Sequence, residues 1–231
     1  MTVILFFIII NAAIVSLVSI FLKKEGLIAL YVSYVIVSQL LINFHIIIKN
    51  QNFVLGSIAF GYIYIVIDVY NELYELKNAS TLIILGIISL MVFLFSSILI
   101  MSVDTIGISY NVKKMIYGNQ IRTILTDIFV SYGIMQFANI VIFDKVKKIT
   151  KSKLLWLRSF CSTFLSQTLT AIFFYEIAFC GIFKQYEIFS MILSGLFIKY
   201  VIVIVEIPIM YLVKRYNKKQ PSMCDEASPK S

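Results

Sequence analysis

Residues 81–103 read TLIILGIISLMVFLFSSILIMSV, a run that contains no charged residue. A helix needs roughly 20 mostly apolar residues to cross the about 30 Å of hydrocarbon in a lipid bilayer. This stretch has the required length and composition. It therefore predicts a transmembrane helix.

Six further stretches have a similar length and are mostly apolar. They are residues 3–22, 27–48, 53–73, 121–143, 157–183 and 188–213. Polar connectors, such as residues 23–26 and 49–52, separate them. The stretch 53–73 is the least apolar, because Asp68, Asn71 and Glu72 fall in its C-terminal half. The pattern predicts an all-α membrane protein with seven transmembrane helices.

The composition of the whole chain agrees with this prediction. Hydrophobic residues make up 60% of the 231 residues and charged residues only 14%, whereas a soluble chain carries nearer a quarter charged residues. The three cysteines are too few and too scattered for a disulfide framework or a zinc site. The sequence also has no glycine-rich nucleotide motif and no nucleophile or metal set. We therefore expect neither an enzyme nor a bound cofactor or metal.

The basic residues, which give the chain a net charge of +8, are concentrated in a few segments. With seven spans, residues 23–26, 74–80 and 144–156 lie on the same side as the C-terminal tail, and this side holds most of the lysines. The positive-inside rule then places these segments in the cytoplasm and the N-terminus outside the plasma (inner) membrane. No basic face of a soluble domain is present, so we expect no nucleic-acid partner. Residues 217–231 are polar and are predicted to be a disordered cytoplasmic tail.

Ionisable residues inside a predicted span are costly unless they face the bundle interior or water, so they mark candidate functional sites. Asp68 and Glu72 are four residues apart and hence on one face of a helix. Two such carboxylates repel each other unless a cation, a proton or a donor-rich ligand lies between them. This favours a ligand site. The alternative is that both lie at the membrane surface, where they are solvated or cap a helix.

A polar and aromatic pattern occurs twice, at an offset of 31 residues. The members of its two copies are Ser131, Gln136, Asn139 and Phe143, then Ser162, Gln167, Thr170 and Phe174. In each copy the amide and the residue three positions later share a helix face, with the aromatic ring about one turn beyond. The spacing is compatible with two amides that face each other across a cavity and bind the edge of a heterocycle. It is equally compatible with ordinary interhelical hydrogen bonding.

Five more charged residues lie within or near the predicted spans. Arg122 and Arg158 stand near the start of theirs, where arginine commonly anchors a helix at the interface. Asp127 follows Arg122 by about one turn, and we expect the two to pair. Lys199 and Glu206 are two turns apart on one helix face, which predicts an ion pair buried in the bundle.

These residues resemble the queuosine precursor transporter family, also called the vitamin uptake transporter or YhhQ-type family. The likeness runs from about residue 27 to residue 216 and is carried by four blocks. They are Asp68 to Tyr74 with Lys77 and Ala79; Arg122 through Ser131, Tyr132, Gln136 and Phe143; Leu155 to Arg158 through Ser162, Thr163, Gln167 and Phe174 to residues 177–179; and Lys199 and Tyr200 with Pro208 and Tyr211.

The resemblance implies a six-helix transporter core over residues 27–216, similar to the substrate-binding subunits of energy-coupling-factor transporters. Residues 1–26 then form an extra N-terminal transmembrane helix. The implied function is import of a 7-deazaguanine, such as preQ0, preQ1 or queuine, for tRNA modification. The expected partners are this small-molecule base and the lipid bilayer, with energising subunits or further copies of the chain as candidates. The alternatives are a vitamin-binding subunit of an energy-coupling-factor type transporter and a membrane interaction protein that transports nothing.

The resemblance also implies roles for individual residues. Asp68 or Glu72 is expected to accept the N–H groups of the base, Gln136 and Gln167 to bind the complementary groups, and Phe174 to stack on the ring. The family usually has aspartate three residues after each glutamine, where this chain has Asn139 and Thr170, which we also place in the site. Structural or coupling roles are implied for Arg122, Arg158 and Lys199.

Overall fold

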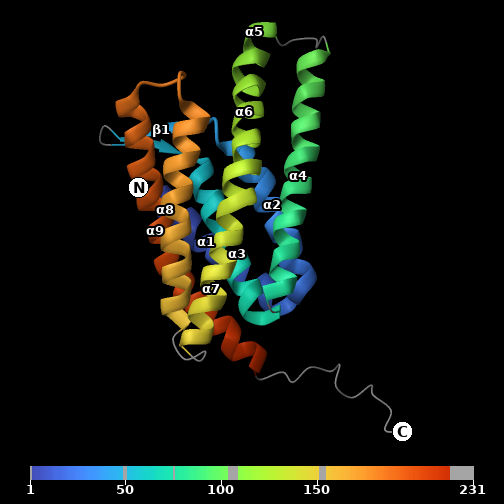
Figure 1. The fold of residues 1–231 in the computed structure, drawn as a ribbon, viewed down its shortest axis with the longest axis vertical. Coiled ribbons are helices and arrows are strands. Elements are labelled where there is room, and N and C mark those ends of the chain that lie inside the picture. Colours follow the sequence, from blue (N-terminus) through green and yellow to red (C-terminus); the bar gives the residue numbers. More distant parts are fainter. Residues whose placement is uncertain (1, 49–50, 75, 104–108, 151–154, 219–231) are drawn as a thin grey trace.

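We describe the protein from a computed structural model that covers residues 2–48, 51–74, 76–103, 109–150 and 155–218. For some of these residues, including Arg158 and Glu206, only the backbone is described. Helices run up and down a single bundle (Figure 1). Their bounds are α1 Thr2–Phe21, α2 Lys23–Leu41, α3 Gly56–Tyr74, α4 Leu76–Ser102, α5 Tyr110–Lys113, α6 Asn119–Thr126, α7 Phe137–Ile149, α8 Leu155–Phe179 and α9 Gln185–Lys218.

Each predicted span overlaps a helix or a run of consecutive helical elements, and the structure is that of an α-helical membrane protein. Among the described residues, four helices are long and apolar enough to cross a bilayer. They are Lys23–Leu41, Ser80–Ser102, Tyr110–Ile149 and Gln185–Tyr216. The apolar part of α1, Phe6–Phe21, is shorter than these. Seven transmembrane passes therefore stay a prediction, of which four are supported by length and composition.

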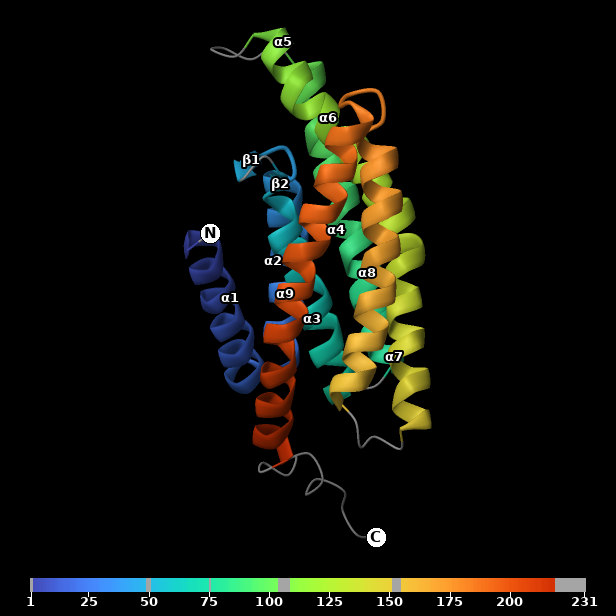
Figure 2. The same ribbon diagram turned by 90° about the vertical axis from the view of Figure 1, so that its left-hand side faces the viewer.

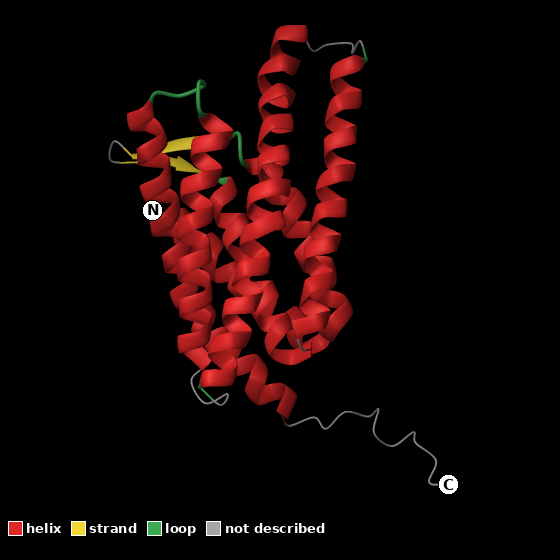
Figure 3. Ribbon diagram, viewed as in Figure 1, coloured by secondary structure: helices red, strands yellow, loops and turns green. Residues whose placement is uncertain are grey.

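A short hairpin corrects the predicted ends of the second and third spans. Strands β1, His45–Ile48, and β2, Gln51–Val54, pair antiparallel with His45 opposite Val54 (Figure 3). The three isoleucines of β1 are β-branched and favour extended backbone. The hairpin is fixed to α9, because the Ser194 hydroxyl donates to the Asn52 carbonyl over 2.5 Å.

Helix α3 is the centre of the bundle. Every residue from Gly56 to Asn71 is buried, and α3 packs against α1, α2, α4, α7 and α9. The outer helices, in contrast, expose large apolar side chains. Examples are Phe95 of α4 and Phe129 of the helical segment Tyr110–Ile149. Because its neighbours shield α3 from lipid, this helix tolerates tyrosines and carboxylates that a lipid-facing helix would not. This accounts for the low apolar content of residues 53–73.

One helical segment is much longer than a bilayer requires. Tyr110–Ile149 spans 40 residues, roughly 60 Å at the rise of an α-helix. Its α5 and α6 end, together with the end of α4, projects beyond the other helices (Figures 1 and 2). The segment is interrupted by two π-helices, η1 Lys114–Gly118 and η2 Asp127–Gln136. Wide π turns inside a helix are rare and frequently occur at functional sites, and η2 leads directly to the pocket described next.

Candidate functional site

A pocket lies inside the bundle, where four helical segments meet the end of α2. Its lining is Ser38, Ile42, Ser57, Phe60, Asp127, Ser131, Thr170, Phe174, Tyr175 and Lys199. Two of the residues predicted to bind substrate, Thr170 and Phe174, are in this lining. The pocket combines hydroxyls, aromatic rings and both signs of charge within an otherwise apolar bundle, as expected of a small-molecule site.

The pocket is narrow. The space between atoms at the pocket and its opening is about 310 Å³, but the centre of a water molecule fits in only about 20 Å³ of it. A single water needs roughly 10–15 Å³ by that measure. A ligand larger than water therefore enters only if the surrounding helices or side chains move.

Asp127 supplies the negative charge of the pocket. Its side chain is 2% exposed; one carboxylate oxygen accepts a hydrogen bond from Gln39 Nε2, and the other accepts from Ser131 Oγ at 2.6 Å. The predicted pair with Arg122 is wrong, because Arg122 donates to the Ile177 carbonyl at 2.8 Å. Residues five apart lie about 140° around an α-helix from each other, so Asp127 faces the interior while Arg122 faces α8.

Lys199 supplies the positive charge. Its side chain is 3% exposed, and its ammonium lies 4.8 Å from the centre of the Phe60 ring. In the described part of the chain, no carboxylate lies within ion-pair distance of this ammonium and no acceptor within hydrogen-bond distance. The predicted partner Glu206 lies outside the described side chains. The pocket thus holds two buried opposite charges that do not touch.

Asp68 of α3 does not line the pocket. Its side chain is hydrogen-bonded to residues of α7 and α8. Its Oδ1 accepts from Asn139 Nδ2 at 2.9 Å and its Oδ2 accepts from Thr163 Oγ1 at 3.0 Å. The Ser166 hydroxyl is 3.1 Å from the Asn139 side-chain oxygen. Asp68 and Asn139, both predicted to bind substrate, therefore bind each other and fix α3 against α7 and α8.

The two departures from the family pattern suit this network. An aspartate at position 139 would place a second carboxylate at hydrogen-bond distance from Asp68, and the two charges would repel. Thr170 donates to the Ser166 carbonyl at 2.7 Å and lies 3.2 Å from the Tyr64 hydroxyl. Since Thr170 already uses its proton, Tyr64 is the donor of that second bond. Tyr64 lies one helical turn from Asp68 on α3 and donates to the pocket residue Thr170. It therefore connects the surroundings of Asp68 to the pocket wall.

The two predicted glutamines are fully buried but do not line the pocket. Gln136 Oε1 accepts from the Tyr31 hydroxyl at 2.8 Å, which is an interhelical bond of the ordinary kind. Gln136 Nε2 and Gln167 Oε1 are buried without a hydrogen-bond partner among the described residues. The structure therefore gives no pair of amides facing each other across this cavity.

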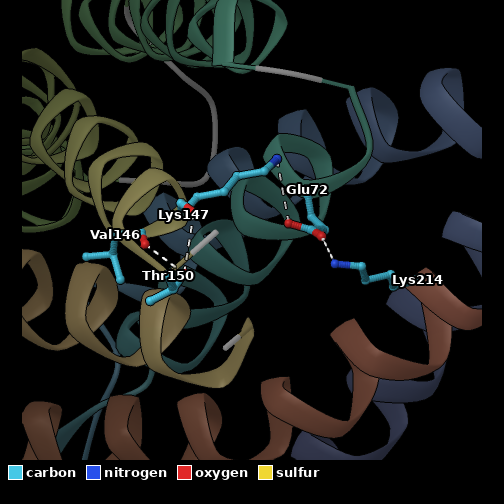
Figure 4. Close-up of polar contacts among 5 residues, drawn as sticks. All are labelled: Glu72, Val146, Lys147, Thr150 and Lys214. Carbon is cyan, nitrogen blue, oxygen red and sulfur yellow. Dashed lines mark hydrogen bonds and ion pairs between the residues drawn. The ribbon is translucent and has the colours of Figure 1, made fainter. Parts of the chain in front are cut away.

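Glu72 has partners of its own, far from the pocket. Its carboxylate is 2.6 Å from Lys214 Nζ and 3.8 Å from Lys147 Nζ, and Figure 4 shows it between α7 and α9. The Thr150 hydroxyl, which donates to the Val146 carbonyl at 2.8 Å, closes the end of α7 beside it. Asp68 and Glu72 thus bind different groups, and no ligand shared between them is needed to relieve their repulsion.

Sequence reasoning missed part of the pocket. Ser38 and Gln39 are adjacent polar residues inside the predicted span 27–48, and both are buried. The rule that polar residues within a span face the bundle interior would have selected them. The same rule would have selected Ser57 in the predicted span 53–73, whereas Tyr175 offered no comparable signal. The Tyr175 hydroxyl donates to Ser57 Oγ at 3.2 Å.

Comparisons with known proteins agree with the resemblance. A protein of Bacillus subtilis (strain 168) named "Probable queuosine precursor transporter" is 27% identical to this chain over 164 residues, which are 70% of this chain and 71% of that protein. No solved structure matches the chain. The model of the family described as "Putative vitamin uptake transporter" matches residues 54–213, which is more than half of the chain and includes α3 to α8 and most of α9. The chain therefore belongs to this vitamin uptake transporter family.

Proposed function

We propose that this protein imports a 7-deazaguanine, such as preQ0, preQ1 or queuine, for tRNA modification, and that the base binds in the pocket around Asp127. The name of the Bacillus relative and the family support a transporter of this kind. The observation that carries the proposal is a buried carboxylate in a pocket that also has aromatic walls.

The chemistry of the base fits these residues. A deazaguanine presents adjacent N–H donors along one edge, and a carboxylate accepts two such donors side by side. Each Asp127 oxygen already accepts one bond, and a carboxylate has about four acceptor positions, so capacity for two donors remains. Phe174 offers a ring for stacking, and Ser131 and Thr170 offer hydroxyls beside it.

The other predicted site residues have supporting roles in this proposal. Asp68, Asn139 and Gln136 hold the helices that form the pocket wall, and Gln167 lies on the same face of α8 as Thr170 and Phe174. Glu72 fixes α3 at the end of the bundle and does not contact the base. Arg122 holds α6 against α8 through the Ile177 carbonyl.

We further propose the architecture that the resemblance implies: an extra helix in residues 1–26, a six-helix core in residues 27–216 like the substrate-binding subunits of energy-coupling-factor transporters, and a cytoplasmic tail in residues 217–231. The ends of α7 and α9 lie together at one end of the bundle (Figure 2). Lys145, Lys147 and Lys148 of α7 and Lys214 of α9 are near this end, so the positive-inside rule favours it as the cytoplasmic one.

The proposal is tested by uptake of labelled preQ1 and queuine in a host that lacks its own transporter. We expect saturable uptake of at least one of them. Absence of uptake of both, by a protein shown to reach the membrane, would contradict the proposal.

A matched pair of variants locates the site within the same assay. Phe174 lines the pocket, whereas its neighbour Phe173 is 47% exposed on the outer face of α8. Stacking on an aromatic ring contributes about 1–3 kcal/mol per base. We therefore expect Phe174→Ala to raise KM about tenfold or more and Phe173→Ala to leave it unchanged. Equal effects of the two would remove the pocket from the proposal.

A further inference from the structure

The ammonium of Lys199 is the feature of the pocket that the proposed function leaves unused. An ammonium buried in a membrane bundle is costly, and such groups normally pair or line a substrate pathway. Lys199 is 3% exposed and lines the pocket. Its only described polar contact is the face of the Phe60 ring at 4.8 Å. A cation–π contact occupies one side of the ammonium and satisfies none of its N–H groups with an acceptor.

The pocket therefore offers donors and an acceptor at the same time. Lys199 has three N–H donors and no acceptor, whereas the Asp127 carboxylate only accepts. The two come from different elements, α9 and η2, and line the same cavity. A ligand that carries N–H donors and an acceptor oxygen along one edge can satisfy both. A lactam ring, in which a carbonyl adjoins a ring N–H, has this arrangement.

We infer that Lys199 determines specificity by donating a hydrogen bond to the carbonyl oxygen of a lactam ring whose N–H groups face Asp127. This inference rests on the proposed function and adds the group that the protein uses to recognise the carbonyl. It assigns Lys199 a contact with the ligand in place of the structural or coupling role predicted from the sequence.

The alternative role for Lys199 is that of a distant counter-charge for Asp127, with no contact to the ligand. In that case its removal would weaken the binding of every ligand by the same factor. A direct hydrogen bond to the carbonyl instead predicts that the loss depends on the acceptor in the ligand. The ratio between two ligands that differ only at this atom separates the two roles.

The experiment uses the full-length protein and two probes, 7-deazaguanine and 7-deaza-6-thioguanine. The second replaces the carbonyl oxygen by sulfur, which is a weak acceptor, and keeps the ring N–H and amino groups. Inhibition of labelled preQ1 uptake gives an inhibition constant for each. We expect the wild-type protein to prefer the oxygen compound about tenfold, because a charge-assisted hydrogen bond is lost with sulfur.

Two variants measure the share of that preference which depends on Lys199. Lys199→Met keeps the length of the side chain without a donor, and we expect the preference to fall to about twofold or less. Lys199→Gln restores a neutral donor and should recover part of it. The size of sulfur affects all three proteins equally and cancels in the comparison.

The outcomes separate this inference from the proposed function. If the wild-type protein takes up no deazaguanine, the proposed function fails; stabilisation of the purified protein against heat by the two probes then gives the same ratio without transport. If neither probe binds, the role of Lys199 as a carbonyl donor falls as well. If wild-type uptake is normal and Lys199→Met keeps the tenfold preference, the inference alone is overturned.

Discussion

Two groups of buried charges lie at different places in this bundle, and they differ in how their charges are balanced. At one end, Glu72 is 6% exposed and contacts Lys214 at 2.6 Å and Lys147 at 3.8 Å. In the pocket, Asp127 and Lys199 are both nearly fully buried and make no ion pair with each other. The first arrangement leaves no need for a ligand, whereas the second leaves an ammonium whose donors a ligand can use.

The difference has a physical reason in the position of the charges. The lysines that bind Glu72 are 26% and 29% exposed, so their long side chains reach water while their head groups pair with the carboxylate. Asp127 and Lys199 are only 2% and 3% exposed, and leaving a charge unpaired is most costly where water is excluded. A protein retains such an arrangement when the charges serve a function, which is why we place the substrate at the pocket and a structural role at Glu72.

The largest effect is expected from Asp127→Asn, which acts on the pocket alone. The amide removes the charge and one acceptor oxygen, and it places an N–H group against the donors of Gln39 or Ser131. Loss of a charge-assisted contact is expected to lower uptake by about 10- to 100-fold. Uptake is measured per amount of protein in the membrane. The matched control is Asp144→Asn, which alters a carboxylate on α7 outside the pocket.

Glu72→Gln is expected to have the opposite profile, with a large effect on stability and a small one on binding. It leaves two lysines without their carboxylate, which costs about 1–3 kcal/mol when the partners are partly exposed. The apparent melting temperature of the purified protein should fall by about 2–10 °C. The KM of uptake should change less than threefold. A large rise in KM with unchanged stability would reverse the contrast between the two charge groups.

The two lysines around Glu72 should contribute unequally. Lys214 is in direct contact with the carboxylate and Lys147 is more than 1 Å farther away, and the interaction energy falls with distance. We expect Lys214→Met to lower stability by about 1–2 kcal/mol and Lys147→Met by about half of that. Thermal unfolding of the two variants side by side measures the difference. A larger effect at Lys147 would show that the closer contact is not the stronger one.

The smallest effect is expected at the surface of α7. Lys148 and Asp144 form an i, i+4 pair at 2.8 Å, and the Lys148 side chain is 76% exposed. Such pairs contribute about 0.3–0.5 kcal/mol because water screens them. Lys148→Ala should leave both stability and uptake close to those of the wild-type protein. A loss comparable to that of Lys214→Met would mean that exposure does not separate these pairs.

The amino-acid sequence by itself determined the class of the protein and much of its helical layout. Runs of apolar residues predict membrane helices because hydrophobicity and helix length are local properties. The long uncharged run 81–103 became helix α4 for this reason, and family-specific residues spread over several helices identified the family. Of the seven residues predicted to bind substrate, Thr170 and Phe174 line the pocket.

Only the tertiary structure decided which polar groups meet. Asp127 was expected to pair with its sequence neighbour Arg122, yet it binds Gln39 from α2 and lines the pocket. The rotation of each helix about its axis, altered here by the π turns of η2, sets which side chains face inward. The choice of neighbouring helices then decides the partners, and that choice depends on packing across the whole bundle rather than on spacing within one segment. Packing between helices likewise brings Lys147 and Lys214 to Glu72 and places Lys199 in the pocket lining.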